Sequence, residues 1–381
     1  MKRSHDQGLR IGLFYPSTPA LHVCSRVIAD QRPDVTDPQT HREMAGTCEE
    51  IGLDFLFVAD RWTPYGPAST ASRFQDPILH APTLGMFLGA VTQHCGIVTT
   101  VHTTYHHPAH IARMGATLDR LTGGRWAMNV VTGIPGSDEF ALFGLEDSEH
   151  DDRYARATRF LEIVRKLWVG EDISYQGPDF VARGQMVGPS PIQARPLIVN
   201  AGSSAAGQEF IAREADWVFL LSSQEQVAAK LANIERLAQA HDREPGAVRA
   251  LLVGSVIVRD SDAEAEAAGQ RVRDSIDIEA AREYLMAVMG MESYQSFFAG
   301  DDELTALTYQ GSGGSGPRLY GSAATVAEQI IAMHRDFACR GIALSFPLWE
   351  PSEIRRFGVE VLPILQRAGV WEHPKDRGWS W

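Results

Sequence analysis

Short polar segments that directly follow apolar, strand-like runs contain the residues of this 381-residue sequence best suited to chemistry. These segments are Asp60-Arg61, Thr100 with His102, Asn129 with Thr132-Gly133, Gly202-Ser203-Ser204, and Ser345-Phe346. Asn, Thr, Ser and Gly in such positions suit a ligand held by neutral hydrogen bonds. No Ser/His/Asp combination has a spacing typical of nucleophilic catalysis, and no His-x-His motif follows the first strand-like run. The pattern therefore does not favour a triad hydrolase or a metal-dependent hydrolase.

The segment Gly202-Ser203-Ser204 lies between an apolar run and a predicted helix that begins near Ala205. The N–H groups at a helix N-terminus, together with two hydroxyls, would form an anion site. Ordinary capping of the helix by a serine explains the same residues, and the sequence leaves both interpretations open. Arg153-Tyr154, at the start of another predicted helix, would add a cation and a phenol to that anion, or would lie in a solvated first turn.

Four histidines lie close together in the sequence, at His102, His106, His107 and His110. His106 and His110 would share a helix face only if the helix began before Pro108, whereas proline favours the first helical position. We therefore expect no metal site here. The histidines are interpreted as lining the mouth of a pocket, with one or two of them exposed.

These residues must be positioned by a regular scaffold, and strand-like runs alternate with helical stretches along the chain. The predicted strands are Arg10–Tyr15, Leu53–Ala59, Gly96–Val101, Trp126–Val131, Pro196–Asn200, Trp217–Leu221, Leu251–Val258 and Ile342–Phe346. Such an alternation predicts an α/β fold of the (β/α)₈ TIM-barrel type, whose active sites lie at the C-terminal ends of the strands. A doubly wound sheet is less favoured, because no Gly-x-Gly-x-x-Gly motif follows the first strand.

The alternation is interrupted between residues 262 and 318, where the sequence is first helix-rich and then glycine-rich, without a predicted strand. We interpret this stretch as an insertion between the seventh and eighth strands of a single domain that spans residues 1–381. The tail, residues 369–381, contains Trp371, Trp379 and Trp381. It is expected to cover either its own barrel or a neighbouring subunit.

The composition argues against several classes of protein. The 35 Lys and Arg residues against 48 Asp and Glu residues give a net charge of −13, which does not suit nucleic acid or an anionic membrane as the main partner. No apolar run approaches the roughly 20 residues needed to span a bilayer, and Asp6 and Pro16 interrupt any signal-peptide core. The four cysteines form no metal or redox motif. We therefore expect a reduced, cytoplasmic enzyme.

Several longer motifs narrow the function. They are ARMGATLDRLTGGR at 112–125, NVVTG at 129–133, EFALFG from Glu139, HDDRYARATRFLEIVRKLW at 150–168 and AGSSAAG at 201–207. Together they resemble the bacterial luciferase-like flavin monooxygenases, within the branch of the pyrimidine, dimethylsulfone and alkanesulfonate monooxygenases. The resemblance extends from the first strand to about Leu365. It implies a TIM barrel that binds FMN at its C-terminal mouth, and a homodimer or homotetramer.

The resemblance also implies roles for individual residues. The flavin-contacting positions correspond to Asp60, Arg61, Asn129, Glu139, Arg153, Tyr154 and Ser204. Ser203, Ser204 and Tyr154 would hold the phosphate, whereas the catalytic pair Thr100 and Asn129 would lie near flavin N5. In such enzymes reduced FMN reacts with O₂, and a flavin peroxide oxygenates the substrate. A separate NAD(P)H:flavin reductase would supply the reduced flavin, since the sequence has no nicotinamide-binding fingerprint.

Departures from the family pattern bear on the substrate. The basic Arg-x-His group of the sulfonate-oxidising members is replaced by Val253-Gly254-Ser255, and the arginine before their glycine-rich loop by Tyr309-Gln310. Simple alkanesulfonates are therefore expected to be poor substrates, because the clamp for their charge is missing. A nitrogen heterocycle or a small sulfone fits better. Its candidate walls are Trp62, Tyr65, Phe74, His102 and Phe346, for each of which core packing is an equal explanation.

Two other functions remain open on the sequence. One is an oxidoreductase of the same superfamily that uses the deazaflavin F420 and transfers hydride without oxygen. The other is a catalytically silent flavin-binding protein on the same barrel.

Overall fold

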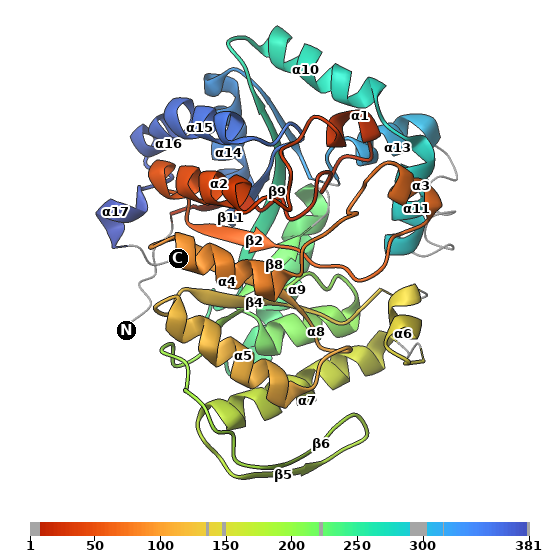
Figure 1. The fold of residues 1–381 in the computed structure, drawn as a ribbon. Helices are drawn as coiled ribbons and strands as arrows, with labels where there is room; N and C mark the ends of the chain where they lie inside the picture. Colours follow the sequence, from red (N-terminus) through yellow and green to blue (C-terminus); the bar gives the residue numbers. More distant parts are fainter. Residues whose placement is uncertain are drawn as a thin grey trace.

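A closed barrel of eight parallel strands forms the centre of the computed structural model, which describes residues 8–134, 137–146, 150–220, 224–289, 303–314 and 316–378. The strands follow one another around the barrel as β1, β2, β3, β4, β7, β8, β9 and β11, and β11 pairs with β1 (Figure 1). Their bounds are β1 Arg10–Phe14, β2 Phe55–Val58, β3 Gly96–His102, β4 Trp126–Val131, β7 Leu197–Asn200, β8 Trp217–Leu220, β9 Arg249–Val258 and β11 Cys339–Ser345. The predicted (β/α)₈ barrel is confirmed, with each predicted strand present.

Helices surround the barrel. Outside the stretch 262–318 they are α1 Arg26–Ala29, α2 Pro38–Ile51, α3 Pro67–Ala71, α4 Ala81–Val91, α5 Pro108–Leu121, α6 Asp138–Leu142, α7 His150–Trp168, α8 Ala205–Glu214, α9 Gln224–Ala240 and α14 Ala323–Asp336, and, after β11, α15 Pro351–Glu360, α16 Leu362–Arg367 and α17 Pro374–Arg377. Local chemistry sets their ends. The Asp37 side chain accepts the Gln39 N–H at the start of α2, and Gly52 ends that helix with a φ of 81°.

Large side chains pack against glycines inside the barrel. A Cβ atom at Gly12 would overlap the ring of Phe55, and one at Gly341 would lie 2.8 Å from the Trp217 ring. One layer closer to the C-terminal ends lie the rings of Phe14, Phe57 and Phe219. Phe57 is 5.0 Å from Phe14 and 5.4 Å from Phe219 between ring centroids. We call these three rings the aromatic floor, because the polar residues at the barrel mouth lie above them.

The stretch between residues 262 and 318 contains α10 (Asp262–Asp274), α11 (Ile278–Met289) and α13 (Glu303–Gly311). The strand β10 (Arg318–Gly321) follows it and pairs in parallel with β9. The sequence did not indicate β10, because its residues RLYG begin with a charged side chain and end with glycine and so form no apolar run. In Figure 1, α11 and α13 lie beside α3, at the end of the barrel toward which the arrow of β2 points.

The described part of the tail packs on its own barrel. Trp371 is buried, the ring of His373 lies over Gly52, and the guanidinium of Arg377 pairs with Asp54, whose side chain is 0% exposed. Of the two expectations for the tail, this part follows the intramolecular one. Trp379 and Trp381 lie outside the described residues.

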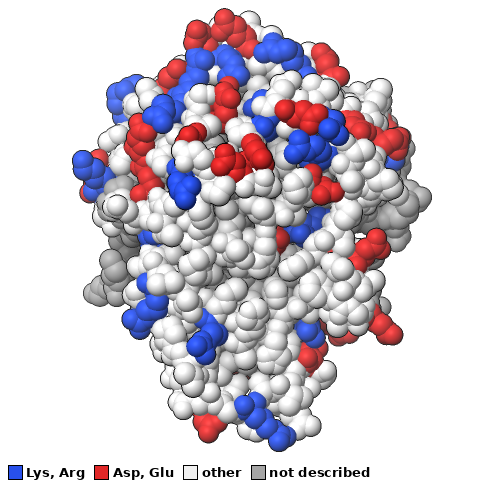
Figure 2. All heavy atoms as spheres, in the orientation of Figure 1, with Lys and Arg blue, Asp and Glu red and all other residues white. Residues whose placement is uncertain are grey.

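Two smaller features complete the fold. A β-hairpin of β5 (Ile173–Gln176) and β6 (Val181–Gly184) extends from the barrel beyond α7 (Figure 1). On the face seen in Figure 2, acidic and basic side chains are intermixed, mostly over α2, α10 and α15, and the middle of that face carries few charges. Within the described ranges, no helix combines the length and the apolar character needed to cross a membrane.

Candidate active site at the barrel mouth

Thr100 and Asn129 lie side by side at the mouth, because the parallel register of β3 and β4 pairs them directly. The Asn129 side-chain amide donates to Thr100 Oγ1 over 3.0 Å. The Thr100 hydroxyl in turn donates to the Val58 carbonyl over 2.9 Å. This chain of hydrogen bonds across β2, β3 and β4 fixes the orientation of both side chains before any ligand binds.

Asp60, Arg61 and Glu139 form a second group at the end of β2. Glu139 is 1% exposed, and its carboxylate accepts the backbone N–H of Trp62 over 2.9 Å and the Tyr105 hydroxyl over 3.1 Å. The Arg61 guanidinium lies 4.0 Å from that carboxylate and 3.6 Å above the Tyr65 ring. The helix α6, far from β2 in sequence, therefore contributes the counter-charge to a buried arginine at the mouth.

Burial shifts the pKa values of the ionisable groups on this side of the mouth. It raises the pKa of Asp60 to about 7, although the backbone N–H groups of Ala81 and Arg61 donate to the carboxylate. It lowers the pKa of His102 to about 3 and that of His106 to about 4. Both imidazoles are therefore uncharged at neutral pH, which suits a ligand bound through neutral groups.

The turn between β7 and α8 forms a close-packed cradle. A Cβ atom at Gly202 would lie 2.8 Å from the Gly207 Cα and would overlap the Tyr154 hydroxyl. Ser204 caps α8 by accepting the Gly207 N–H over 3.1 Å, so the capping interpretation is confirmed for this serine. Tyr154, on α7, is buried and hydrogen-bonds Thr132. Hydroxyls and a helix N-terminus thus converge at one point of the mouth.

The remaining predicted cofactor residues are placed differently. Ser203 is exposed in the same turn, next to Ser204. Arg153 is 2% exposed, and its guanidinium lies 5.9 Å from the centroid of the Phe140 ring on α6. Arg153 therefore packs beside the segment that carries Glu139.

The aromatic candidates for a substrate wall fall into two groups. Trp62 and His102 lie at the mouth: Trp62 packs 5.4 Å from His80, and His102 stacks 5.4 Å from Tyr105 between ring centroids. Each of the other three also packs against a residue on a helix outside the barrel. Tyr65 and Phe74 form a cluster with Tyr284 of α11, and Phe346 packs 6.2 Å from Phe357 of α15, in the layer outside the barrel.

Sequence reasoning missed three residues of the mouth. Asn200 accepts the Gly202 N–H over 2.8 Å and donates to the Val130 carbonyl over 2.8 Å, so it braces the cradle. Tyr105 binds Glu139, and His22 approaches Ser345 at the end of β11. The position of Asn200 directly before the AGSS motif was an available signal. Neither Tyr105 nor His22 lies in a motif or a periodic pattern.

Comparison with known proteins decides the family. A family model described as luciferase-like monooxygenase matches residues 12–339. The chain belongs to the luciferase-like monooxygenase family. Its kinship with named monooxygenases identifies it as a flavin-dependent monooxygenase, as the motifs implied.

Three relatives illustrate the range of this family. Nitrilotriacetate monooxygenase component A of Aminobacter aminovorans is 30% identical, and the match covers 88% of this chain and 87% of that protein. The FMNH₂-dependent dimethylsulfone monooxygenase of Pseudomonas fluorescens is 27% identical and matches over 95% of both chains. A riboflavin lyase, solved with modified FMN and the substrate riboflavin, has a TM-score of 0.87 and 26% identity, covering 96% of this luciferase-like monooxygenase and 93% of the lyase chain.

Proposed function

We propose that this protein is the oxygenating component of an FMN-dependent two-component monooxygenase. It would use reduced FMN and O₂ to oxygenate a small organic substrate of the nitrogen-heterocycle or sulfone type. A separate NAD(P)H:flavin reductase would supply the reduced FMN. The observation that carries the proposal is the cradle of Tyr154, Gly202, Ser204 and Gly207, which lies on the same arc of the mouth as Thr100 and Asn129.

The residues of the cradle fit a phosphate group. Because Gly202 and Gly207 lack side chains, the turn packs directly against the first turn of α8 and against the Tyr154 hydroxyl, which brings that hydroxyl to the N-terminus of the helix. The hydroxyls of Ser203, Ser204 and Tyr154 surround this point and would hold the phosphate of FMN. Since the net charge of the chain is −13, such a local site must bind the anion against the overall field.

The ring system of FMN would extend from the cradle along the arc β4, β3 and β2. There Asn129, Glu139, Arg61 and Asp60 would contact it, above the aromatic floor. The barrel order supports this path, because β7, β4, β3 and β2 are consecutive strands. When bound, reduced FMN supplies the activation of O₂, which no protein side chain can provide. The chain itself orients the ring through Asn129 and excludes water through the buried aromatic and neutral histidine side chains.

The residues around Val253-Gly254-Ser255 support the proposal that the substrate is uncharged. Val253 packs with the aromatic floor, and the Ser255 hydroxyl lies 3.1 Å from the Tyr320 hydroxyl. The nearby Arg318 guanidinium donates to the carbonyls of Gly313, Gly314 and Gly316. This arginine is therefore used by the backbone of the glycine-rich loop and does not replace the missing clamp for a sulfonate.

A binding titration separates the proposal from its main alternative. Purified protein is titrated anaerobically with reduced FMN and, separately, with reduced F420, and binding is followed by fluorescence. We expect saturable binding of reduced FMN and at least tenfold weaker binding of F420. Preferential binding of F420 would favour a hydride-transferring oxidoreductase. FMN binding without conversion of any tested substrate under O₂ would favour a silent flavin-binding protein.

The same proposal predicts substrate preference. With a flavin reductase, NADH and FMN present, turnover of uracil or dimethyl sulfone should exceed turnover of ethanesulfonate. Efficient oxidation of ethanesulfonate would contradict the substrate part of the proposal without affecting its cofactor part.

A further inference from the structure

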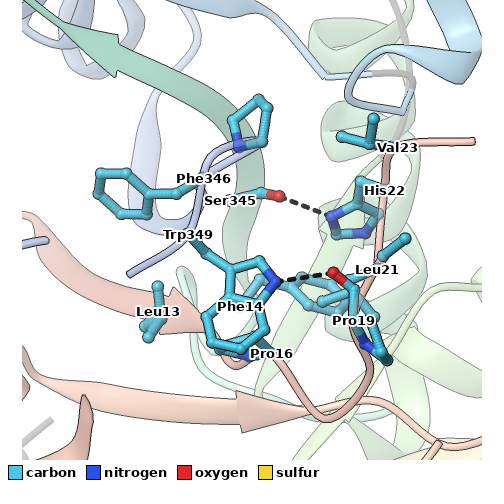
Figure 3. A pocket seen from close by; sticks show the side chains of 12 residues that line it. Leu13, Phe14, Pro16, Pro19, Leu21, His22, Val23, Ser345, Phe346 and Trp349 are labelled. Atoms are coloured by element: carbon cyan, nitrogen blue, oxygen red, sulfur yellow. Dashed lines mark hydrogen bonds between the residues drawn. The ribbon is translucent and has the colours of Figure 1, made fainter. Parts of the chain in front are cut away.

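His22 and Ser345 form a hydrogen-bonded pair at the part of the mouth that the proposed flavin contacts do not occupy. His22 lies in the loop after β1, and Ser345 is the last residue of β11. The His22 Nδ1 atom is 2.7 Å from Ser345 Oγ, although the two residues are 323 positions apart in sequence. Figure 3 shows the serine hydroxyl and the imidazole pointing toward each other, whereas Phe346 points away from them.

The pair belongs to a small, mostly apolar pocket. Its walls include Phe14, Leu21, Phe346 and Trp349, next to His22 and Ser345. The ring of Phe14, part of the aromatic floor, meets the His22 ring edge-on at 4.5 Å between centroids. The Trp349 indole donates to the Pro19 carbonyl over 2.9 Å, which ties the His22 loop to the segment after β11 (Figure 3). The pocket thus combines one rigid polar pair with aromatic surface.

The second nitrogen of His22 is not used by the protein. Its ring is half-buried, and Nε2 has no hydrogen-bond partner in the described part of the chain. Burial, with a smaller contribution from the Arg318 charge, lowers the pKa of His22 to about 4. The imidazole is therefore neutral at pH 7. It can offer one hydrogen bond through Nε2, with Ser345 accepting or donating the complementary bond at Nδ1.

The pocket lies across the barrel mouth from the phosphate cradle. In the order of eight strands, β1 is opposite β7 and β11 is opposite β4. An elongated cofactor anchored by its phosphate beside β7 would therefore extend toward the side on which His22 and Ser345 lie. A substrate that meets the far end of that cofactor would be bounded by this pocket.

We propose that His22 is a substrate-contacting, specificity-determining residue: held by Ser345, it gives one neutral hydrogen bond to an uncharged substrate whose apolar body packs on Phe14. This inference rests on the proposed function and adds a residue that recognises the substrate through a hydrogen bond. The Nε2 atom offers a single hydrogen bond, which matches one carbonyl, sulfone or ring-nitrogen atom of such a substrate.

Two substitutions of His22 separate the two ring nitrogens. In His22→Asn the side-chain amide reaches the position of Nδ1 and keeps the bond to Ser345, but nothing replaces Nε2. In His22→Gln the longer amide reaches the position of Nε2. We expect His22→Asn to raise the KM for uracil or dimethyl sulfone about tenfold, with kcat within about threefold. His22→Gln should recover most of the loss, and Ser345→Ala should raise KM by about threefold through lost orientation.

The dissociation constant for reduced FMN is measured in parallel and should stay within about threefold in all three variants. A purely structural role for His22 would change kcat, thermal stability and flavin affinity together, and would contradict the proposal. An unchanged KM in His22→Asn would also contradict it, as would FMN-bound wild-type protein that binds neither uracil nor dimethyl sulfone. Wild-type protein that fails to bind reduced FMN would instead contradict the proposed function.

Discussion

The amide of Asn129 donates to the hydroxyl of Thr100 across the β3–β4 pair, over 3.0 Å. The backbone fixes this contact, because the strand register pairs the two residues and the Thr100 hydroxyl donates to the Val58 carbonyl. Side chains fixed in this way before ligand binding act without paying for reorganisation during the reaction. The pair therefore links the barrel itself to the proposed chemistry at the mouth.

Replacement of Asn129 tests this link. Asn129→Ala should strongly reduce substrate turnover, because the oriented amide near the flavin ring is lost. Affinity for reduced FMN should fall by no more than about tenfold, or roughly 1.4 kcal/mol, since the phosphate cradle is untouched. Steady-state rates and anaerobic flavin titration measure the two effects. Thr100→Ser, which keeps the hydroxyl, is the matched control and should retain turnover; wild-type rates in Asn129→Ala would refute the assignment.

A methyl group at Gly202 probes the cradle. In Gly202→Ala the new Cβ would overlap the Tyr154 hydroxyl and crowd Gly207, so the turn must shift. We expect at least a tenfold loss of affinity for FMN. Gly46→Ala, on the exposed face of α2, is the control because its Cβ would meet nothing within 4 Å. That variant should keep flavin affinity and gain about 0.5–1 kcal/mol of stability. Equal flavin affinity in the two variants would argue against the cradle.

The low pKa of the buried His102 predicts how the free energy of unfolding changes as the pH falls. Its pKa is about 3 in the folded protein, below the ordinary value of about 6.5, so the unfolded chain binds a proton first as the pH falls. Its contribution to stability is thus fully present above pH 6.5 and is lost progressively toward pH 3. His102→Phe keeps a ring beside Tyr105 and should flatten the dependence of the unfolding free energy on pH in this window. Urea unfolding at several pH values measures it, and parallel curves for variant and wild type would contradict the prediction.

The tail is predicted to stabilise the bottom of the barrel. Arg377 pairs with the buried Asp54 carboxylate, which also accepts the Ile11 N–H over 2.7 Å and lies 3.9 Å from Arg10. Removing one partner of a buried ion pair leaves charge poorly compensated. Arg377→Ala should therefore lower the free energy of unfolding by on the order of 3 kcal/mol, while the flavin affinity at the opposite end stays unchanged. A loss of flavin affinity without a loss of stability would be inconsistent with this role.

The barrel, and the gathering of polar residues at one end of it, could be predicted from the sequence. Strand–helix alternation fixes parallel strands, and polar residues placed just after such strands must meet at one end. This logic brought Thr100 and Asn129 together correctly. It could not find His22, because a loop residue has no periodicity and its partner Ser345 is contributed by the last strand of the barrel.

The contacts of aromatic residues in loops could not be predicted from the sequence either. Phe74 packs on Tyr284 of α11, and Tyr65 packs on both. Nothing in the sequence around Tyr65 or Phe74 indicates that α11 lies against them, because the contact depends on where the stretch after β9 folds back. The β10 strand was missed because RLYG contains no apolar run, unlike the equally short strands β2, β7 and β8.

Incorporation of oxygen into the product tests the central proposal most directly. Purified protein, FMN, NADH and a flavin reductase are incubated with uracil or dimethyl sulfone under isotopically labelled O₂, and the product is analysed by mass spectrometry. The proposed function predicts a product that carries one labelled oxygen atom and that does not form without O₂ or without FMN. An unlabelled product, or the same product formed anaerobically, would contradict it.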